Sequence, residues 1–229
     1  MSGLPDPPRN NKMPFAETAE RLRQVYSAVL CDVLDSLGFR RQALSYRVRP
    51  LFSEALLIGR ARTLVSHPVD RFPETPYAKE LEALDTLEPD DVIVFDTGED
   101  LHSAVWGELL SVASLAKGAR GAVIDGLTRD AAKIRELRFP VFARGISSYD
   151  SYGRSEVIAY DVPITCDGVA VQSGDVVFGD YDGVVVIPAA TVETVIEKAE
   201  LKVSREKVVE GEFRKGRKVA DVFAEHGIL

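Results

Sequence analysis

The stretch WGELLSVASLAKGARGAVIDGLTRD, residues 106–130, gives the clearest indication of how this chain folds. Apolar residues recur at helical spacing from Leu109 to Ala116, and Gly118 stands where a helix of that length ends. The run Gly121–Ile124 is short and apolar, which is typical of a strand buried on both faces. These signals predict a helix followed by a buried strand.

The second part of this stretch predicts a turn and another helix. Asp125 and Gly126 form a turn signal, and Thr128 is a favourable N-cap for a helix that ends near Leu137. Two helix N-termini, near Glu108 and Thr128, then lie at the end of the strand. Helix N-termini offer free backbone N–H groups and a positive dipole end, so this region is a natural anion site.

Three charged side chains belong to this predicted site. Arg129 is suited to holding a carboxylate through two hydrogen bonds. Asp130 and Glu108 carry oxygen ligands for a divalent cation, which they would hold directly or through water. An acidic residue in a first helical turn is also stabilised by the helix dipole when nothing binds. Residue types and spacing alone leave both interpretations open.

Composition and charge limit the possible functions. The formal net charge of −8 argues against nucleic acid as the main partner, because phosphate binding requires a basic face. Cys31 and Cys166 are the only cysteines and form no C-x-x-C pair, which favours a reduced chain without a zinc–thiolate site. No apolar run has the length of a signal peptide or membrane span, so we expect a soluble, cytoplasmic protein.

The first half of the chain alternates predicted helices and strands. Residues 22–37 predict an amphipathic helix that ends at Gly38. Residues 56–65 predict a strand in which Gly59 indicates a bulge or a close approach of another backbone. Residues 92–95 predict a further buried strand. We therefore expect α/β layers around a mixed sheet.

The second half is predicted to be rich in β structure. Short apolar runs between residues 157 and 187 are separated by turns that contain Asp and Gly, which is typical of antiparallel strands. Residues 191–211 predict a long helix. We expect residues 1–14 to be a flexible N-terminal segment and residues 15–229 to form one domain that ends in helices.

Several common catalytic motifs are absent from the sequence. It contains no Gly-x-Gly-x-x-Gly, no phosphate loop, no Gly-x-Ser-x-Gly and no His-Glu-x-x-His. A nucleotide-dependent enzyme, a serine hydrolase and a zinc protease of the His-Glu-x-x-His type therefore have no support.

Four segments together resemble one protein family. They are Gly59–Thr63, Gly118–Gly126 with Arg129 and Asp130, Gly174–Asp175, and Asp180–Pro188. The family joins the ribonuclease-activity regulator A proteins to the 4-hydroxy-4-methyl-2-oxoglutarate aldolases, and some members were once labelled demethylmenaquinone methyltransferases. The resemblance covers roughly residues 19–199. It implies an α/β/β/α arrangement akin to the swivelling domains, with an aldolase/regulator-like domain over residues 15–229.

The resemblance also implies an activity. Aldolase members are class II, metal-dependent pyruvate aldolases, which also decarboxylate oxaloacetate. By this analogy Arg129 binds the pyruvyl carboxylate and keto oxygen together with Gly107 and the backbone N–H groups of Leu109 and Leu110. Asp130 is then the protein ligand to Mg²⁺ or Mn²⁺. A divalent ion suits this chemistry because it stabilises the charge of a pyruvate enolate.

Two acidic residues complete the implied site. Aldolase members carry an acid followed by twenty residues and then Arg-Asp, and here Glu108 stands twenty residues before Arg129. The family's first acid is usually Asp, so this chain departs by one methylene group; Glu108 would act on the metal through water. Members also receive a Glu from the C-terminal helix of an adjacent subunit, for which Glu206 is the match and Glu210 the alternative. A homotrimer or hexamer is implied.

Two functions from different classes remain. The first is the metal-dependent aldolase and decarboxylase. In it, the segment 149–154 and the proline-rich segment 67–76 would shape the far end of a small 2-oxo acid. The second is a non-catalytic regulator that binds and inhibits an RNA-degrading enzyme. Arg129 and Asp130, with an acid at position 108, favour the enzyme. A methyltransferase is rejected, because the chain lacks a Gly-rich strand–helix turn for the cofactor.

Overall fold

The computed structural model describes residues 15–228, so the segment 1–14, which we predict to be flexible, lies outside the described residues. The strands are β1 (Arg49–Pro50), β2 (Leu57–Pro68), β3 (Asp91–Asp96), β4 (Ala104–Trp106), β5 (Gly121–Thr128), β6 (Val141–Ile146), β7 (Ser155–Tyr160), β8 (Ile164–Cys166), β9 (Val169–Val171), β10 (Val176–Gly179) and β11 (Val184–Ile187). The helices are α1 (Phe15–Leu22), α2 (Ser27–Ser36), α3 (Ala78–Asp85), α4 (Glu108–Ala116), α5 (Ala131–Leu137), the 3₁₀ turn η1 (Ala189–Thr191), α6 (Val192–Arg214) and α7 (Val219–His226).

A mixed sheet organises the fold. Its strands follow the order β1-β6-β5-β3-β2-β10-β11, with β4 paired to β5 and β7 paired to β2. The central strands β2, β3, β5 and β6 are parallel, whereas β1, β7, β10 and β11 add to them in antiparallel pairs. Strands β8 and β9 form a separate hairpin. The expected α/β fold with a mixed sheet and a β-rich second half is therefore confirmed.

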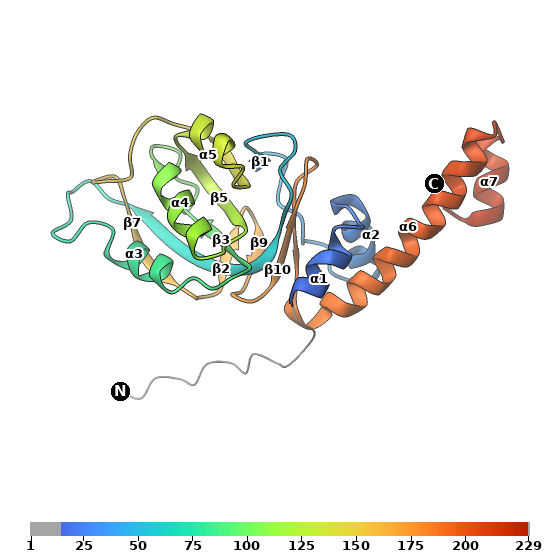
Figure 1. The fold of residues 1–229 in the computed structure, drawn as a ribbon, viewed down its shortest axis with the longest axis horizontal. Coiled ribbons are helices and arrows are strands. Elements are labelled where there is room, and N and C mark those ends of the chain that lie inside the picture. Colours follow the sequence, from blue (N-terminus) through green and yellow to red (C-terminus); the bar gives the residue numbers. More distant parts are fainter. Residues whose placement is uncertain (1–14, 229) are drawn as a thin grey trace.

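The central strands are buried on both faces because alternate side chains enter different cores. In β3, Val92 and Val94 pack with the β8–β9 hairpin, whereas Ile93 and Phe95 pack on the opposite face. Figure 1 shows α3, α4 and α5 over that opposite face. Because both faces are covered, the strand is almost continuously apolar and does not alternate with polar residues.

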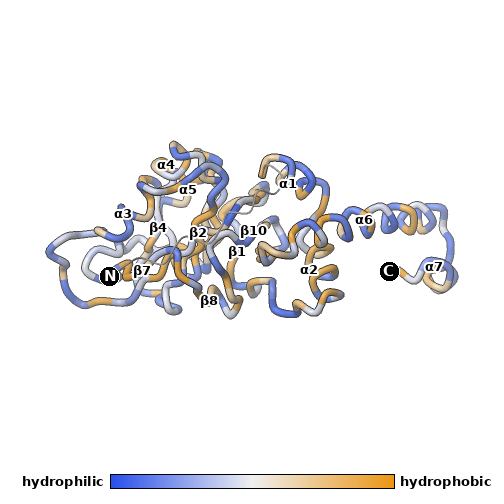
Figure 2. Tube along the Cα trace, turned by 90° about the horizontal axis from the view of Figure 1, so that it is seen from below, coloured by the Kyte–Doolittle hydropathy of each residue, from blue (hydrophilic) through white to orange (hydrophobic). Residues whose placement is uncertain are grey.

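A third core joins the helical end of the molecule to the sheet. Helices α1, α2 and α6 cover apolar residues of β10 and β11, including Phe178 and Ile187. Beyond this contact α6 leads away from the sheet and carries α7 at its far end (Figure 1). Hydrophobic residues concentrate along the strands and α2 (Figure 2). None of the helices within residues 15–228 has the length and apolar character needed to cross a bilayer.

The structure confirms most predicted elements and corrects three details. Gly59 allows a close backbone approach, because a Cβ there would lie 2.5 Å from the carbonyl oxygen of Asp90. The predicted helix over residues 22–37 is two helices, interrupted before Tyr26, which adopts an extended conformation. The predicted turn at residues 125–126 and the predicted N-cap at Thr128 are wrong, because β5 continues through all of them.

Candidate active site at the start of helix α4

Gly107 precedes α4 and lies directly against the pair Arg129–Asp130. A Cβ on Gly107 would stand 2.8 Å from Oδ2 of Asp130 and 3.2 Å from Cγ of Arg129. The backbone of Gly107 is extended, with φ −159°, so its conformation does not require glycine. The absence of a side chain instead permits the close packing of the two segments.

Arg129 and Asp130 follow β5 in a tightly held backbone. The backbone N–H of Arg129 donates to the carbonyl of Trp106 over 2.8 Å, and the hydroxyl of Thr128 donates to the same carbonyl over 3.1 Å. Asp130 has a left-handed backbone, with φ 57°, and serves as the N-cap residue of α5. Such conformations in residues other than glycine are uncommon and often occur at functional sites.

The side chains of the pair contact α4 and a third acid. Oδ2 of Asp130 accepts the backbone N–H of Glu108 over 3.2 Å and lies 3.6 Å from Nε of Arg129. Nη1 of Arg129 lies 3.6 Å from Oδ1 of Asp150. The side chains of Arg129 and Asp130 are 36% and 41% exposed. No hydrogen bond from the described residues reaches Oδ1 of Asp130.

The first turn of α4 offers hydrogen-bond donors beside this pair. The first N–H groups of a helix have no intrahelical acceptor, and that of Glu108 is taken by Asp130. Within residues 15–228, the N–H groups of Leu109 and Leu110 have no other acceptor. The structure therefore brings these N–H groups, Arg129 and Asp130 to one surface, which we call the Arg129 surface. Its N–H groups and Arg129 suit a carboxylate or a keto oxygen.

Buried side chains hold the start of α4 in place. Trp106 is 1% exposed and stacks on Phe139 with ring centroids 6.5 Å apart. Its Nε1 donates to the hydroxyl of Ser111 over 2.9 Å, and that hydroxyl donates to the carbonyl of Gly107 over 2.9 Å. The helix end is thus fixed before any ligand binds, which favours a preorganised site.

Glu206 and Glu210 lie elsewhere in the same chain. Glu206 accepts the hydroxyl of Tyr26 and lies 3.3 Å from Nζ of Lys202, and Glu210 pairs with Arg214. The hydrogen bond to Glu206 raises the pKa of Tyr26 to about 12. Figure 1 shows α6 leading away from α4 and α5. Among the described residues, the contacts of both glutamates are thus with other residues than Arg129 and Asp130.

Asp150, Tyr77 and Glu80 extend the site, and the sequence did not identify them individually. The hydroxyl of Tyr77 donates to Oδ2 of Asp150 over 3.0 Å. Burial, followed by this hydrogen bond, raises the pKa of Tyr77 to about 12. Glu80 is 5% exposed, and its burial, reinforced by the charge of Asp150, raises its pKa to about 8. Only the general positions of the segments 67–76 and 149–154 were indicated by the sequence.

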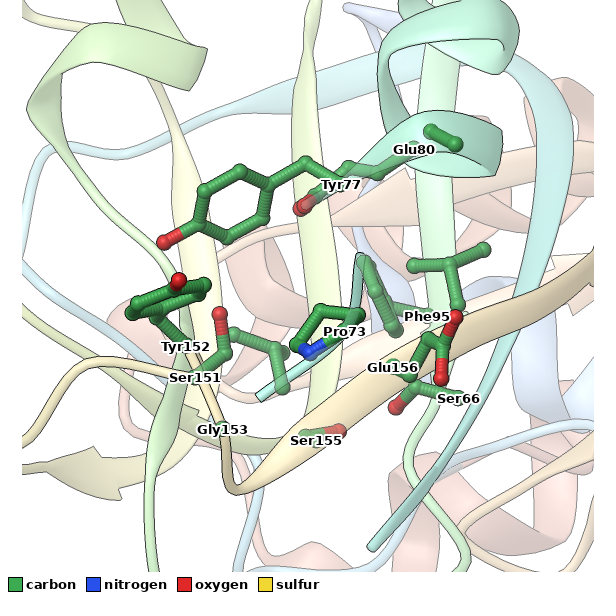
Figure 3. Close-up of a pocket in the computed structure, with 13 residues that line it drawn as sticks. Ser66, Pro73, Tyr77, Glu80, Phe95, Ser151, Tyr152, Gly153, Ser155 and Glu156 are labelled. Carbon is green, nitrogen blue, oxygen red and sulfur yellow. The ribbon is translucent and has the colours of Figure 1, made fainter. Parts of the chain in front are cut away.

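Tyr77 and Glu80 border a small pocket, and Asp150 connects Tyr77 to Arg129. Figure 3 shows Tyr77 and Glu80 on the side of α3, with Ser66, Ser155 and Glu156 on strands β2 and β7 and with Pro73, Ser151 and Tyr152 on the connecting loops. The structure thus brings the segments 67–76 and 149–154 together around one pocket, which we call the Glu80 pocket.

The acidic residues at the Arg129 surface are too few to hold a metal ion alone. They suit a cation whose other ligands are water and substrate oxygens. Within residues 15–228, no group of three or more His, Cys, Asp or Glu side chains is arranged to hold a metal ion. Asp130 retains one oxygen without a protein partner, and Glu108 begins the helix beside it. Mg²⁺ usually keeps several waters and binds through one or two carboxylates together with substrate oxygens. The donor set suits such an ion.

Comparison with known proteins adds the family. The model of the RraA-like family, described as Aldolase/RraA, matches residues 27–186, which include every residue of the Arg129 surface and of the Glu80 pocket. A protein of Halalkalibacterium halodurans, whose name assigns it provisionally as a 4-hydroxy-4-methyl-2-oxoglutarate aldolase, is 32% identical over 80% of this chain and 81% of its own length. Protein DlpA of Legionella pneumophila is 31% identical over 78% of this chain, but the match spans only 29% of DlpA.

Solved structures have the same fold. A crystal structure described as novel cellulases from microbes associated with the gut ecosystem superposes with a TM-score of 0.83, at 30% identity, over 88% of this chain and 90% of that one. RraAS2 of Streptomyces coelicolor, described as an unusual member of the RNase ES inhibitor RraA protein family, superposes with a TM-score of 0.77, at 31% identity, over 87% and 98% of the two chains.

Proposed function

Because this chain belongs to the RraA-like family, described as Aldolase/RraA, we propose that it is a divalent-metal-dependent pyruvate aldolase. It cleaves a 4-hydroxy-2-oxo acid to pyruvate and a second carbonyl compound, and it decarboxylates oxaloacetate at the same site. The observation that carries this proposal is the meeting of Arg129, Asp130 and the free N–H groups of α4 at one open surface.

The chain's own residues bind and orient the 2-oxo acid. Arg129 and the N–H groups of Leu109 and Leu110 hold the carboxylate and the keto oxygen, and the missing side chain of Gly107 lets Arg129 and Asp130 pack against the start of α4. These donors would stabilise the negative charge that develops on the keto oxygen as the bond between C3 and C4 breaks. Removing one preorganised donor of this kind typically lowers the rate by about 10²–10³-fold.

Asp130 would hold Mg²⁺ or Mn²⁺ directly, and Glu108 would hold it through water. When bound, the ion supplies Lewis-acid stabilisation of the developing charge. Asp130 is well placed for this role because one of its oxygens is fixed by the N–H of Glu108 while the other is free. The fixed oxygen sets the direction in which the free oxygen points.

The reaction balances without an oxidant or a reductant. The electron pair of the C3–C4 bond remains on the pyruvyl fragment, which then takes up a proton at C3. The C4 hydroxyl loses its proton and becomes the carbonyl of the second product. In oxaloacetate the leaving group is carbon dioxide, and the same pyruvyl fragment remains. The substantial exposure of Arg129 and Asp130 leaves the site open to the water that exchanges these protons.

We further propose that the working form is a homotrimer or hexamer. Glu206 of the partner subunit, or alternatively Glu210 of the partner subunit, would complete the site. The position of α6 supports this arrangement, because the helix leads away from its own Arg129 surface (Figure 1). Exposed apolar side chains along it, including Leu201 and Val208, suit contact with another subunit.

The test is pyruvate release from oxaloacetate and from 4-hydroxy-4-methyl-2-oxoglutarate, with Mg²⁺ and with EDTA. Arg129→Ala and Asp130→Asn are expected to lower kcat/KM by about 10²-fold or more. Arg135→Ala is the matched control, because Arg135 is an exposed arginine on α5. EDTA is expected to abolish turnover and Mg²⁺ to restore it.

The opposite result would favour the regulator. The likeness to RraAS2, described as a member of an RNase inhibitor family, is the observation that supports this second function. A folded oligomer that releases no pyruvate from either acid, yet inhibits an RNA-degrading enzyme, would overturn the aldolase proposal. Full activity in both the Arg129 and Asp130 variants would overturn the assignment of the site.

A further inference from the structure

The Glu80 pocket is linked to the Arg129 surface through a single carboxylate. Oδ1 of Asp150 lies 3.6 Å from Arg129, and Oδ2 accepts the hydroxyl of Tyr77, which lines the pocket. Ser151, the next residue in the chain, also lines the pocket. A substrate whose carboxylate is held by Arg129 therefore has this pocket within reach of the rest of its chain.

Two serine hydroxyls at the pocket are buried without protein partners, and they lie beside the largely buried Glu80. Glu80 is 5% exposed, and no hydrogen bond from the described residues reaches its carboxyl group. Ser66 and Ser155 are 1% and 8% exposed, and neither hydroxyl has a partner within residues 15–228. Buried polar groups are nearly always hydrogen-bonded, so two unpaired hydroxyls around one space indicate a polar occupant.

Local distortions of the backbone occur next to these groups. The pairing of β2 with β7 shifts its register between Val65 and Ser66, and irregularities of this kind often re-aim side chains near active sites. Gly153 has φ 71°, and a Cβ there would meet the ring of Phe72 at 2.7 Å. Phe72 lies 4.9 Å from Tyr152 between ring centroids, so aromatic rings flank the pocket.

The size and charge of the pocket restrict what it accepts. Its cavity volume is about 20 Å³, enough for one water-sized group. Its lining contains Glu80 and Glu156 but no Lys, Arg or His, and Asp150 lies behind Tyr77. Because burial keeps Glu80 protonated at neutral pH, it can donate a hydrogen bond to an uncharged oxygen. A carboxylate would enter an acidic site without a cation, which is unfavourable.

We propose that the Glu80 pocket binds a terminal hydroxyl group of the substrate, so that the preferred 4-hydroxy-2-oxo acid has a neutral, hydroxylated tail and not a second carboxylate. This inference rests on the proposed aldolase function. The products are then pyruvate and a hydroxyaldehyde, formed by the same movement of electrons and protons as above. The apolar faces of Phe72 and Tyr152 would contact the C–H groups of the tail.

The experiment compares two 4-hydroxy-2-oxo acids on the intact oligomer with Mg²⁺. One is 2-oxo-4,5,6-trihydroxyhexanoate, with a hydroxylated tail, and the other is 4-hydroxy-2-oxoglutarate, with a second carboxylate. Oxaloacetate serves as the reference, because it ends at the carboxylate that leaves and has no tail to enter the Glu80 pocket. We expect kcat/KM for pyruvate release to be about tenfold or more higher for the hydroxylated acid, since a buried hydrogen bond of about 1.4 kcal/mol corresponds to that factor.

Variants of the pocket test the assignment independently. In Ser66→Ala/Ser155→Ala, the ratio of kcat/KM for the hydroxylated acid to that for oxaloacetate is expected to fall about tenfold, mainly through KM. Glu156→Lys adds a cation and is expected to move the preference toward 4-hydroxy-2-oxoglutarate. Ser204→Ala and Glu136→Gln, at exposed positions, are controls that keep the wild-type ratio.

Each remaining outcome separates this inference from the proposed function. Turnover of 4-hydroxy-2-oxoglutarate equal to or better than that of the hydroxylated acid would overturn the assignment of the pocket while leaving the aldolase intact. An unchanged ratio in the double serine variant would do the same. No pyruvate from any of the three acids would overturn both proposals.

Discussion

The backbone N–H of Glu108 donates to Oδ2 of Asp130 over 3.2 Å, although the two residues belong to different helices. This hydrogen bond joins the first residue of α4 to the N-cap residue of α5. It brings the helix donors and the carboxylate into one arrangement before any ligand is present. Changes at this junction should therefore affect activity more than stability.

Gly107→Ala tests the junction directly. The new Cβ would stand 2.8 Å from Oδ2 of Asp130, so the side chains of the pair must move. A displacement of about 1 Å in a catalytic group lowers the rate by about 10²-fold, and we expect a loss of kcat/KM of that size. Gly211→Ala is the control, since a Cβ there meets nothing within 4 Å and its helical position favours alanine. Equal activity of the two variants would contradict the prediction.

Glu108→Gln tests the proposed role of this acid toward the metal. Loss of the charge is expected to raise the half-saturating Mg²⁺ concentration by about 10–100-fold, the usual effect of removing an outer-sphere partner. Isothermal titration of Mg²⁺ in the presence of pyruvate measures this, and Glu108→Asp is expected to stay closer to wild type. Glu136→Gln, on the exposed face of α5, is the control. Unchanged Mg²⁺ affinity in Glu108→Gln would remove Glu108 from the metal site.

Glu80→Gln is expected to change the pH dependence of stability. Burial raises the pKa of Glu80 from its ordinary 4.5 to about 8, so the folded state holds a proton that the unfolded state releases. Its contribution to stability is complete below pH 4.5 and is lost as the pH rises to 8, by about 1.4 kcal/mol per pH unit at most. Glu80→Gln has no carboxyl group here, so its stability does not fall with pH for this reason. Asp150, Tyr77 and Glu156 still face the position in the variant.

Urea unfolding at pH 5, 6.5 and 8 measures the effect. Relative to wild type, Glu80→Gln should gain stability at each step upward in pH, whereas Glu74→Gln should follow the wild-type curve. Parallel curves for wild type and Glu80→Gln would show that Glu80 is already ionised throughout this range.

Arg144→Met is expected to destabilise the fold. Arg144 is almost fully buried, and its guanidinium contacts the carboxylate of Asp125 and, over 2.9 Å, Oδ1 of Asp167. Removing it leaves two buried acids without their cation, which typically costs about 3–5 kcal/mol. Arg120→Met, at an exposed pair with Asp90, should cost less than about 1 kcal/mol. Similar urea midpoints for the two variants would be the contrary result.

The sequence predicted the elements well where one pattern dominates a segment. The predicted buried strand over residues 92–95 lies within β3, and the long helix predicted over residues 191–211 matches α6 from residue 192 onward. The wrong turn at Asp125 and Gly126 has a tertiary cause. Asp125 is buried against Arg144, and a Cβ on Gly126 would lie 2.8 Å from the side chain of Thr97. Glycine serves close packing there, which a local pattern does not distinguish from a turn.

Only those residues of the candidate site that lie in one short stretch could be predicted from the sequence. Arg129, Asp130 and Glu108 lie in one short stretch, so strand and helix signals alone place them near each other. Tyr77 and Glu80 lie at the start of α3, whereas Asp150 lies before β7, and their meeting depends on how β7 and α3 pack across the sheet. A glutamate in an amphipathic helix ordinarily faces water, and only the folded chain reveals that Glu80 is buried.

The left-handed backbone of Asp130 has a consequence for how such a site can diversify. At φ 57° the short acid Asp is well tolerated, while Glu is disfavoured, so position 130 cannot easily change the length of its carboxylate. Glu108 begins an ordinary helix, where either acid is acceptable. The length of the acidic side chain can therefore change during evolution more easily at position 108 than at position 130.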